Sequence, residues 1–258
     1  MTTLALETRG AVRLIHLNRP EVRNALSADM VTELSHTFSK AADDKDVRAV
    51  VLTGTGKAFC AGLDLSELKA VSSRSAEVNR ANSERLGKLF EQIYRFPKPV
   101  VAAVNGHAVA GGAGLASVCD FAVLSENAKV GYTEARIGFV AALVGVFLIR
   151  QVGERIARDL LLSARLVEAD EALRLGLVNE VLPAEEVLAR GLELAKTLSQ
   201  NAPSSLTLTK ELLANLPGMG LSESLRYAAD LNALVRNTAD IKEGVAAFLE
   251  KREPAWRP

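Results

Sequence analysis

Cysteine and histidine are scarce in this chain, and their placement excludes several kinds of site. The 258 residues include two cysteines, Cys60 and Cys119, and three histidines. Neither cysteine belongs to a C-x-x-C pair or a histidine-rich cluster, so the sequence predicts no disulfide and no metal site. A G-x-S-x-G turn is also missing, and His16, His36 and His107 do not lie in the contexts of a Ser-His-Asp triad. An α/β-hydrolase is therefore not expected.

The chain also lacks net charge and long apolar runs. Its 31 Lys and Arg residues balance 31 Asp and Glu residues, so no overall field favours nucleic acid or an anionic membrane. The longest apolar stretch, residues 139–149, is too short to span a bilayer. Glu7 and Arg9 interrupt the N-terminal segment, which has no basic start or apolar core of a signal peptide. We therefore expect a cytoplasmic protein.

What the sequence does contain is an alternation of strand-like and helical segments. Apolar strand-like runs at residues 14–17, 47–53 and 100–104 are separated by helical patterns, one of them over residues 76–94. Ser27 is well placed as the N-cap of an earlier helix. This order predicts an α/β fold with a parallel sheet covered on both faces, whose ligands bind outside the carboxyl ends of the strands.

The last sixty residues differ in character. Leucine and alanine recur at helical spacing in three stretches, residues 205–216, 221–235 and 240–250. The apolar faces exceed what one small bundle would bury, which indicates packing on a neighbouring molecule. We accordingly divide the chain into an α/β core, residues 1–200, and a C-terminal helical region, residues 201–258.

Two glycine-bearing turns carry the main chemical signal. They occupy residues 59–64 and 105–114, and each follows an apolar strand-like run and leads toward a helix. Glycine permits positive φ and close approach of a ligand, and free N–H groups at a helix start favour negative charge. Together the turns could direct two backbone amides at one oxygen and stabilise an enolate. The alternative is that both are simply tight turns of an α/β sheet.

The spacing and flanking residues of these turns are similar to those of the enoyl-CoA hydratase/isomerase (crotonase) superfamily, over nearly the whole chain. The resemblance implies a spiral of strand-strand-helix repeats with a C-terminal all-α trimerisation region. It further implies that the N–H groups of Leu63 and Gly111 form an oxyanion hole for a thioester carbonyl oxygen. The expected activity is enoyl-CoA hydration or isomerisation in fatty or acyl-CoA metabolism.

Glu134 is the candidate general base. Its segment, residues 131–138, is similar to the family segment that carries the second catalytic glutamate. Nearby apolar residues such as Ile137 and Phe139 would desolvate the carboxylate and raise its pKa toward neutrality. The alternative interpretation is a solvated glutamate at a helix start, or a partner for Arg136.

Gly114 stands where two-carboxylate hydratases of the family carry their first glutamate. A single carboxylate is enough to move a double bond from the 3,4 to the 2,3 position, because it can lift a proton from the α-carbon and return it at the γ-carbon. One glutamate could also hold a water molecule for hydration, so both reactions stay open. A third possibility is a non-catalytic or weakly active acyl-CoA-binding scaffold with the same fold.

The resemblance also implies how coenzyme A, as part of the substrate, is held. Arg23, Lys57 and Ala61 would line its binding site, and Phe248 and Lys251 would reach the nucleotide on an adjacent subunit of a homotrimer or a hexamer. A basic surface explains Lys251 equally well. No metal or redox cofactor is implied, and the apolar residues after Gly138 favour an aliphatic acyl group.

Four further polar residues are assigned by their local context. Asp64 is expected to cap the helix after the first turn, and Asp120 and His107 are expected to be structural. For Tyr132 the sequence leaves two roles open, orienting Glu134 or lining the acyl pocket.

Overall fold

A six-stranded sheet forms the centre of the molecule. The structure is a computed structural model and describes residues 2–257. The strand order is β1-β2-β3-β5-β7-β10, and every neighbouring pair from β2 to β10 is parallel, whereas β1 pairs with β2 antiparallel. The strands are β1 (Leu4–Arg9), β2 (Val12–Leu17), β3 (Ala49–Gly54), β5 (Val100–Val104), β7 (Phe121–Ser125) and β10 (Glu180–Leu182).

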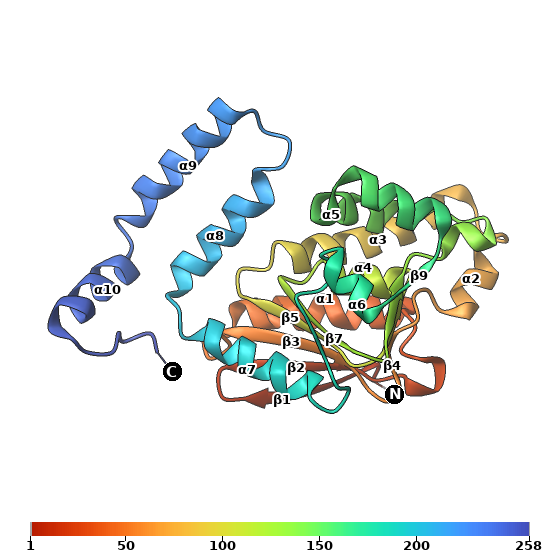
Figure 1. Cartoon of the computed structure of the whole chain (residues 1–258), viewed down its shortest axis with the longest axis horizontal. Coiled ribbons are helices and arrows are strands. Elements are labelled where there is room, and N and C mark those ends of the chain that lie inside the picture. The colour runs from red at the N-terminus through yellow and green to blue at the C-terminus, as the bar shows by residue number, and fades with distance from the viewer. Residues whose placement is uncertain (1, 258) are drawn as a thin grey trace.

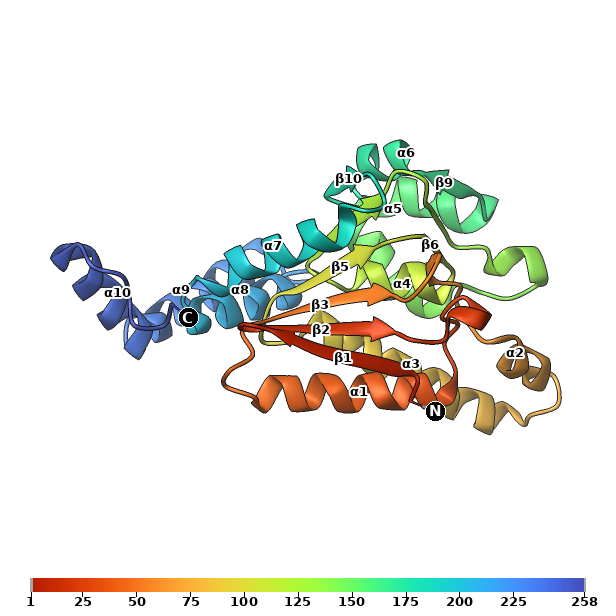
Figure 2. The same ribbon diagram turned by 90° about the horizontal axis from the view of Figure 1, so that it is seen from below.

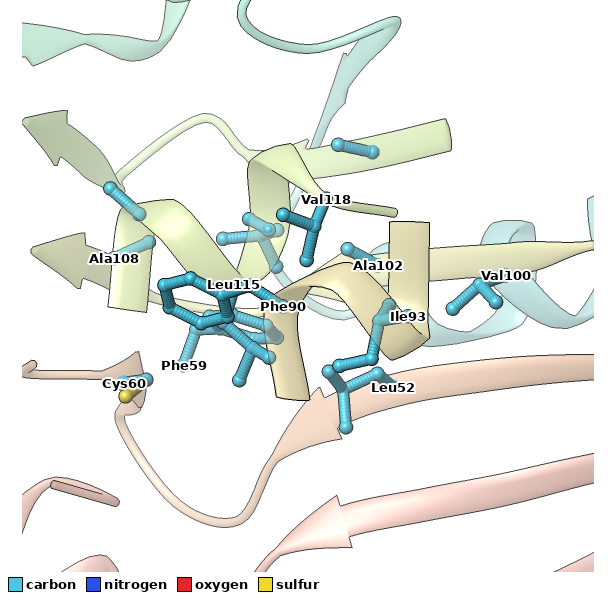
Figure 3. Close-up of a cluster of buried hydrophobic side chains, with 14 of the residues drawn as sticks. Leu52, Phe59, Cys60, Phe90, Ile93, Val100, Ala102, Ala108, Leu115 and Val118 are labelled. Atoms are coloured by element: carbon cyan, nitrogen blue, oxygen red, sulfur yellow. The ribbon is translucent and has the colours of Figure 1, made fainter. Parts of the chain in front are cut away.

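Helices cover both faces of this sheet, as its sequence predicts. All residues of β3 and β5 are buried, and such uninterrupted apolar strands need cover on each side. Figure 2 shows α1 (Ala28–Asp43) and α7 (Val187–Ser199) on opposite sides of the sheet. The larger apolar core, which includes Leu52, Phe59 and Phe90, lies on the side of α1 and α3 (Ala76–Tyr94) (Figure 3).

Local sequence signals place several elements correctly. The side chain of Ser27 accepts a hydrogen bond from the Met30 N–H and caps α1. Helix α3 spans the residues that its apolar spacing predicts, 76–94. The side chain of Asp64 caps α2 (Leu65–Val71) by accepting from the Ser66 N–H. These signals depend on residues only a few positions apart, which is why the sequence alone reveals them.

A second sheet has four strands, and three of them come directly after strands of the first sheet in the chain. After β3, β5 and β7 the chain forms β4 (Ala58–Cys60), β6 (His107–Val109) and β8 (Lys129–Gly131), which pair in the order β4-β6-β8 and are joined by β9 (Leu166–Glu168). The backbone is closely packed where the chain passes from the first sheet to the second. A Cβ on Gly54 would lie only 2.3 Å from a backbone oxygen, and one on Gly106 only 2.2 Å. This repetition confirms the strand-strand-helix fold implied by the family resemblance.

The α/β core contains further helices. They are α4 (Gly111–Ser117), α5 (Ala142–Ser163) and α6 (Ala169–Arg174), with short 3-10 helices η1 (Pro20–Val22) and η2 (Glu134–Ile137). Gly111 is the first residue of α4.

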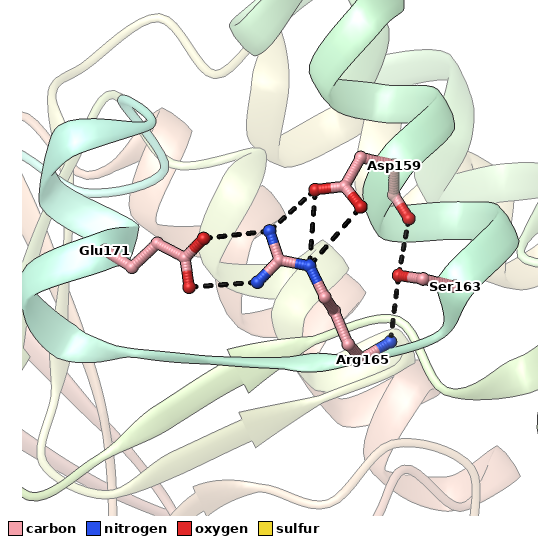
Figure 4. Close-up of polar contacts among 4 residues, drawn as sticks. All are labelled: Asp159, Ser163, Arg165 and Glu171. Atoms are coloured by element: carbon pink, nitrogen blue, oxygen red, sulfur yellow. Dashed lines mark hydrogen bonds and ion pairs between the residues drawn. The ribbon is translucent and has the colours of Figure 1, made fainter.

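The guanidinium group of Arg165 forms hydrogen bonds beside β9, the edge strand of the small sheet. Arg165 lies between α5 and β9, and its Nη2 donates to Asp159 at 2.6 Å and to Glu171 at 2.8 Å (Figure 4). Its Nη1 makes a second bond to Glu171 at 2.9 Å. Because Leu166 of β9 pairs with Gly131 of β8, this cluster holds the strand that leads to Glu134.

Three C-terminal helices project away from the layered core. They are α8 (Pro203–Asn215), α9 (Leu221–Val235) and α10 (Ala239–Glu250), and Figure 1 shows α9 and α10 extending beyond the sheet layers. The ion pair between Lys210 and Asp120 ties α8 to the core, consistent with the structural role expected for Asp120. Within residues 2–257, no helix is both long and apolar enough to cross a membrane.

Candidate active site

The three groups expected to act in catalysis follow three adjacent strands of the small sheet. Leu63 comes after β4, Gly111 after β6 and Glu134 after β8, and these strands pair in that order. All three residues line one cavity of about 430 Å³. The sheet therefore brings together groups that lie far apart in the sequence.

The two glycine turns are in direct contact. Gly62 has a φ of +91°, and a Cβ built on it would lie 2.9 Å from both Ala110 Cβ and Val109 O. The same Cβ would be 3.4 Å from the Gly111 nitrogen. Only glycine at position 62 allows this approach, so the turns are adjoining walls of one site.

Both backbone amides are free to bind a ligand. The Leu26 N–H donates to Gly62 O at 2.7 Å, and the Asp64 N–H donates to Leu26 O at 3.0 Å. These bonds hold the chain on either side of Leu63, whose own N–H has no partner among residues 2–257. The Gly111 N–H is likewise unpaired within the described chain, as expected for the first residue of a helix. Two free donors thus lie beside the same cavity.

Glu134 presents a partly desolvated carboxylate. It is half-buried at the start of η2, and its Oε2 is buried with no hydrogen-bond partner among the described residues. Burial raises the pKa of Glu134 above its ordinary value, whereas its own backbone hydrogen bond acts in the opposite direction. The raised pKa makes this carboxylate a stronger base than an exposed glutamate, as a group that accepts and returns a proton requires.

The position of the missing first glutamate is occupied by other side chains. A Cβ on Gly114 would lie 2.2 Å from Val144 Cγ1 and 3.2 Å from Phe90 Cε2. A side chain at position 114 therefore requires the Val144 side chain to move. Glu67 is the one other carboxylate lining the cavity among the described residues, and it is paired with Arg74 at 2.7 Å. Glu134 is therefore the unpaired carboxylate of the site.

Arg19 supports the first turn, and sequence analysis missed it. Its Nη1 donates to Asp64 Oδ2 at 2.7 Å and to Ala25 O at 2.9 Å. The Asp64 carboxylate also accepts from the Ser66 hydroxyl at 2.6 Å, and this bond is the main cause of its lowered pKa. No signal in the sequence connects Arg19 with a residue so distant along the chain.

The apolar wall agrees with an aliphatic acyl portion. Phe139, Val140 and Leu143 line the cavity, as do Leu86 and Phe90 of α3. Tyr132 does not line it. That side chain is 1% exposed and belongs to the core, and its hydroxyl has no hydrogen-bond partner among residues 2–257.

The residues assigned to coenzyme A lie in different places. Ala61 lines the cavity. Arg23 and Lys57 are exposed and outside it, although Arg23 O accepts a hydrogen bond from the Ala61 N–H at 3.0 Å. Phe248 is 83% exposed near the end of α10, which Lys251 follows, and neither contributes to the cavity within this chain.

His107 takes a structural part. Its Nδ1 accepts a hydrogen bond from the Lys129 N–H at 3.0 Å, which links β6 to β8, and it does not line the cavity.

Known proteins resemble this chain over its whole length. The family described as enoyl-CoA hydratase/isomerase matches residues 7–258. A Thermus thermophilus protein named "Putative enoyl-CoA hydratase" is 55% identical over 248 residues, covering 96% of this chain and 98% of that protein. The "Short-chain-enoyl-CoA hydratase" of Clostridium acetobutylicum is 34% identical over 259 residues, covering 98% and 97%. The crystal structure of an enoyl-CoA hydratase from Mycobacterium smegmatis has a TM-score of 0.93 at 33% identity and covers 100% of both chains.

Proposed function

Because the chain belongs to the enoyl-CoA hydratase/isomerase family, we propose that it moves the double bond of a 3-enoyl-CoA thioester to the 2,3 position. The observation that carries this proposal is the closure of position 114 by Val144 and Phe90, which leaves Glu134 as the unpaired carboxylate. Isomerisation needs one group that first accepts a proton and then returns it. The reacting thioester is the substrate, and this chemistry calls for no further cofactor.

The reaction starts with the thioester carbonyl oxygen between the N–H groups of Leu63 and Gly111. As Glu134 takes a proton from the α-carbon, the electron pair of the broken C–H bond moves toward the carbonyl oxygen and forms a dienolate. Two fixed donors stabilise this charge, each by roughly 3 kcal/mol. The dienolate then collapses as protonated Glu134 returns the proton to the γ-carbon, which leaves the double bond between the α- and β-carbons and restores the enzyme.

Hydration of a 2-enoyl-CoA is the second candidate, favoured by the names of the relatives in Thermus and Clostridium. Glu134 would take a proton from water while the water oxygen bonds to the β-carbon, and would then give that proton to the α-carbon. The same two amides would hold the intermediate enolate. The two reactions therefore use the same residues, and they differ in that hydration adds water at the β-carbon whereas isomerisation only moves a proton from the α-carbon to the γ-carbon.

The test is a paired assay of crotonyl-CoA hydration and 3-hexenoyl-CoA isomerisation with the wild type, Glu134→Gln and the control Glu126→Gln. Glu126 is exposed and does not line the cavity. We expect isomerisation to be the faster reaction, and Glu134→Gln to lower it by roughly a hundredfold or more. Faster hydration with the same sensitivity would favour the second candidate. Activity that survives in Glu134→Gln would reject the assigned base.

Absence of both reactions, with retained binding of coenzyme A, would instead favour the non-catalytic scaffold. Measuring coenzyme A binding by calorimetry separates that outcome from an unfolded preparation.

We further propose that residues 201–258 form an oligomerisation region and that the protein is a homotrimer or a hexamer. Exposed apolar side chains on α9 and α10 support this, among them Leu221, Leu225 and Phe248, which are 78%, 62% and 83% exposed. In such an assembly Phe248 and Lys251 would contact the nucleotide bound to a neighbouring subunit, while Arg23 and Lys57 would face the phosphates. A cytoplasmic location stays a prediction.

A further inference from the structure

One end of the active-site cavity is polar, and the apolar wall does not explain it. Along α3, the residues lining the cavity change from Phe90 and Leu86 to Ser83, Asn82 and Asn79. Their spacing places them on one face of the helix. Phe90 lies at Gly114, in the interior of the site, so the cavity becomes more polar toward the beginning of α3.

Arg74 is a half-buried hydrogen-bond donor that lines the cavity near the beginning of α3. It follows α2, lines the cavity, and its side chain is only 29% exposed. Its Nη1 donates to Glu67 Oε2 at 2.7 Å, but its Nε and Nη2 have no partner among residues 2–257. The ion pair with Glu67 thus fixes the guanidinium while leaving donors for a ligand.

The surrounding groups leave this end electropositive. Arg85 also lines the cavity and has no ion-pair partner among the described residues, so residues 65–90 contribute two guanidinium groups and one carboxylate, that of Glu67, to the cavity lining. Asn82 is half-buried, and its side chain makes no hydrogen bond in the part of the chain that the structure describes. Asn79 Nδ2 donates to Val71 O at 2.8 Å and holds the ends of α2 and α3 together.

We infer that the preferred acyl group carries a carboxylate at the end remote from the thioester, bound by Arg74 and Asn82. This inference rests on the proposed function, because it places the thioester at Leu63 and Gly111. Helix α2 separates Leu63 from Arg74 and, with seven residues, is about 10 Å long. Arg74 is thus a specificity-determining residue, distant from the reacting carbons, and the apolar residues between the two ends contact the methylene chain.

The experiment compares pairs of 3-enoyl-CoA substrates that differ only in a terminal carboxylate. The hexenoyl, octenoyl and decenoyl chains are each tested against the corresponding dioic monothioester, so that a mismatch in length cannot hide the effect. For at least one length, we expect the wild type to favour the carboxylate by about tenfold to a hundredfold in kcat/KM, as for a hydrogen bond between charged groups.

Variants then assign the preference to Arg74. Arg74→Met should remove most of it, and Arg74→Lys should restore only part, because a lysine cannot reproduce the planar donor geometry. The matched control is Arg80→Met, since Arg80 is exposed, pairs with Glu84 at 2.8 Å and does not line the cavity. Circular dichroism verifies that each variant is folded.

Equal kcat/KM for both members of every pair, or a preference that persists in Arg74→Met, would overturn the inference. If no 3-enoyl-CoA is turned over, the proposed function fails. The inference is then tested by calorimetry with saturated acyl-CoA and the matching dioic monothioesters. Tighter binding of the carboxylate form by the wild type, but not by Arg74→Met, would still support it, and equal binding would reject it.

Discussion

Arg19 Nη1 lies 2.7 Å from Asp64 Oδ2, and Asp64 directly follows Leu63, which lines the active-site cavity and whose N–H has no partner among residues 2–257. The same carboxylate caps α2 through the Ser66 N–H at 2.9 Å. One side chain therefore connects the turn around Arg19, the start of α2 and the Leu63 amide. We conclude that the direction of this N–H depends on an ion pair outside the cavity, because neither Arg19 nor Asp64 lines it.

Arg19→Met should lower kcat more than it affects the fold. The variant removes the anchor of Asp64, and a small displacement of a catalytic donor costs between roughly tenfold and a hundredfold in rate. Steady-state kinetics with 3-hexenoyl-CoA provides the measurement. The control is Arg13→Met, which removes a longer ion pair to Asp44, 3.3 Å, away from the cavity. An unchanged kcat in a folded Arg19→Met protein would contradict the positioning role.

The pH dependence of catalysis should reflect the burial of Glu134. Desolvation raises its pKa above the ordinary value of 4.5, and a proton acceptor acts only when deprotonated. Activity should therefore decline on the acid side as the pH falls through this raised pKa. The measurement is kcat/KM as a function of pH, which gives the pH at which activity declines on the acid side. Tryptophan fluorescence over the same pH range checks for unfolding. An acid limb below pH 4.5 would be inconsistent with a desolvated base.

Gly114→Ala should destabilise the protein by about 1–3 kcal/mol, because its Cβ would overlap a neighbouring side chain in a packed core. The contact is with Val144 Cγ1, 2.2 Å from the ideal Cβ position. Val144→Ala removes that atom, so the double variant should be less destabilised than the sum of the two single variants. Urea denaturation gives all three free energies of unfolding. Simple additivity would mean that Val144 does not close this position.

Ala110→Gly should stabilise the protein by about 1 kcal/mol while preserving activity. Ala110 has a φ of 53° and a ψ of −122°, a conformation that is strained for a residue with a Cβ. Glycine adopts it freely, and the relief exceeds the entropy lost on folding. Thermal and urea denaturation are the measurements. Ala108→Gly in β6, where φ is not positive, is the control and should destabilise. If both variants lose stability equally, Ala110 is not strained.

The sequence predicts the parts of this molecule that depend on neighbouring residues. The cap at Ser27, the helix over residues 76–94 and the two glycine turns are local patterns, and the family resemblance places Leu63, Gly111 and Glu134 near one another. The absence of a carboxylate at position 114 is also visible in the sequence.

Long-range contacts could not be predicted in the same way. The pairing of Arg19 with Asp64 and the closure of position 114 by Val144 join segments whose distance depends on the completed fold. The polar end of the cavity, with Arg74 and Asn82, could not be predicted from the sequence for a related reason. The apolar residues after Gly138 describe one wall of the cavity, whereas α2 and α3 supply another.

The order of β4, β6 and β8 bears on how such an enzyme could acquire new substrates. In the proposed mechanism each strand leads to one reacting group, and backbone pairing keeps the strands about 4.8 Å apart whatever side chains lie beyond them. The segment from Glu67 to Leu86, whose exchange keeps Ser66 and its bonds to Asp64, can thus be replaced during evolution, or by protein engineers, without disturbing the reacting atoms. Swapping this segment between homologues should transfer acyl-chain preference and leave the chemistry in place.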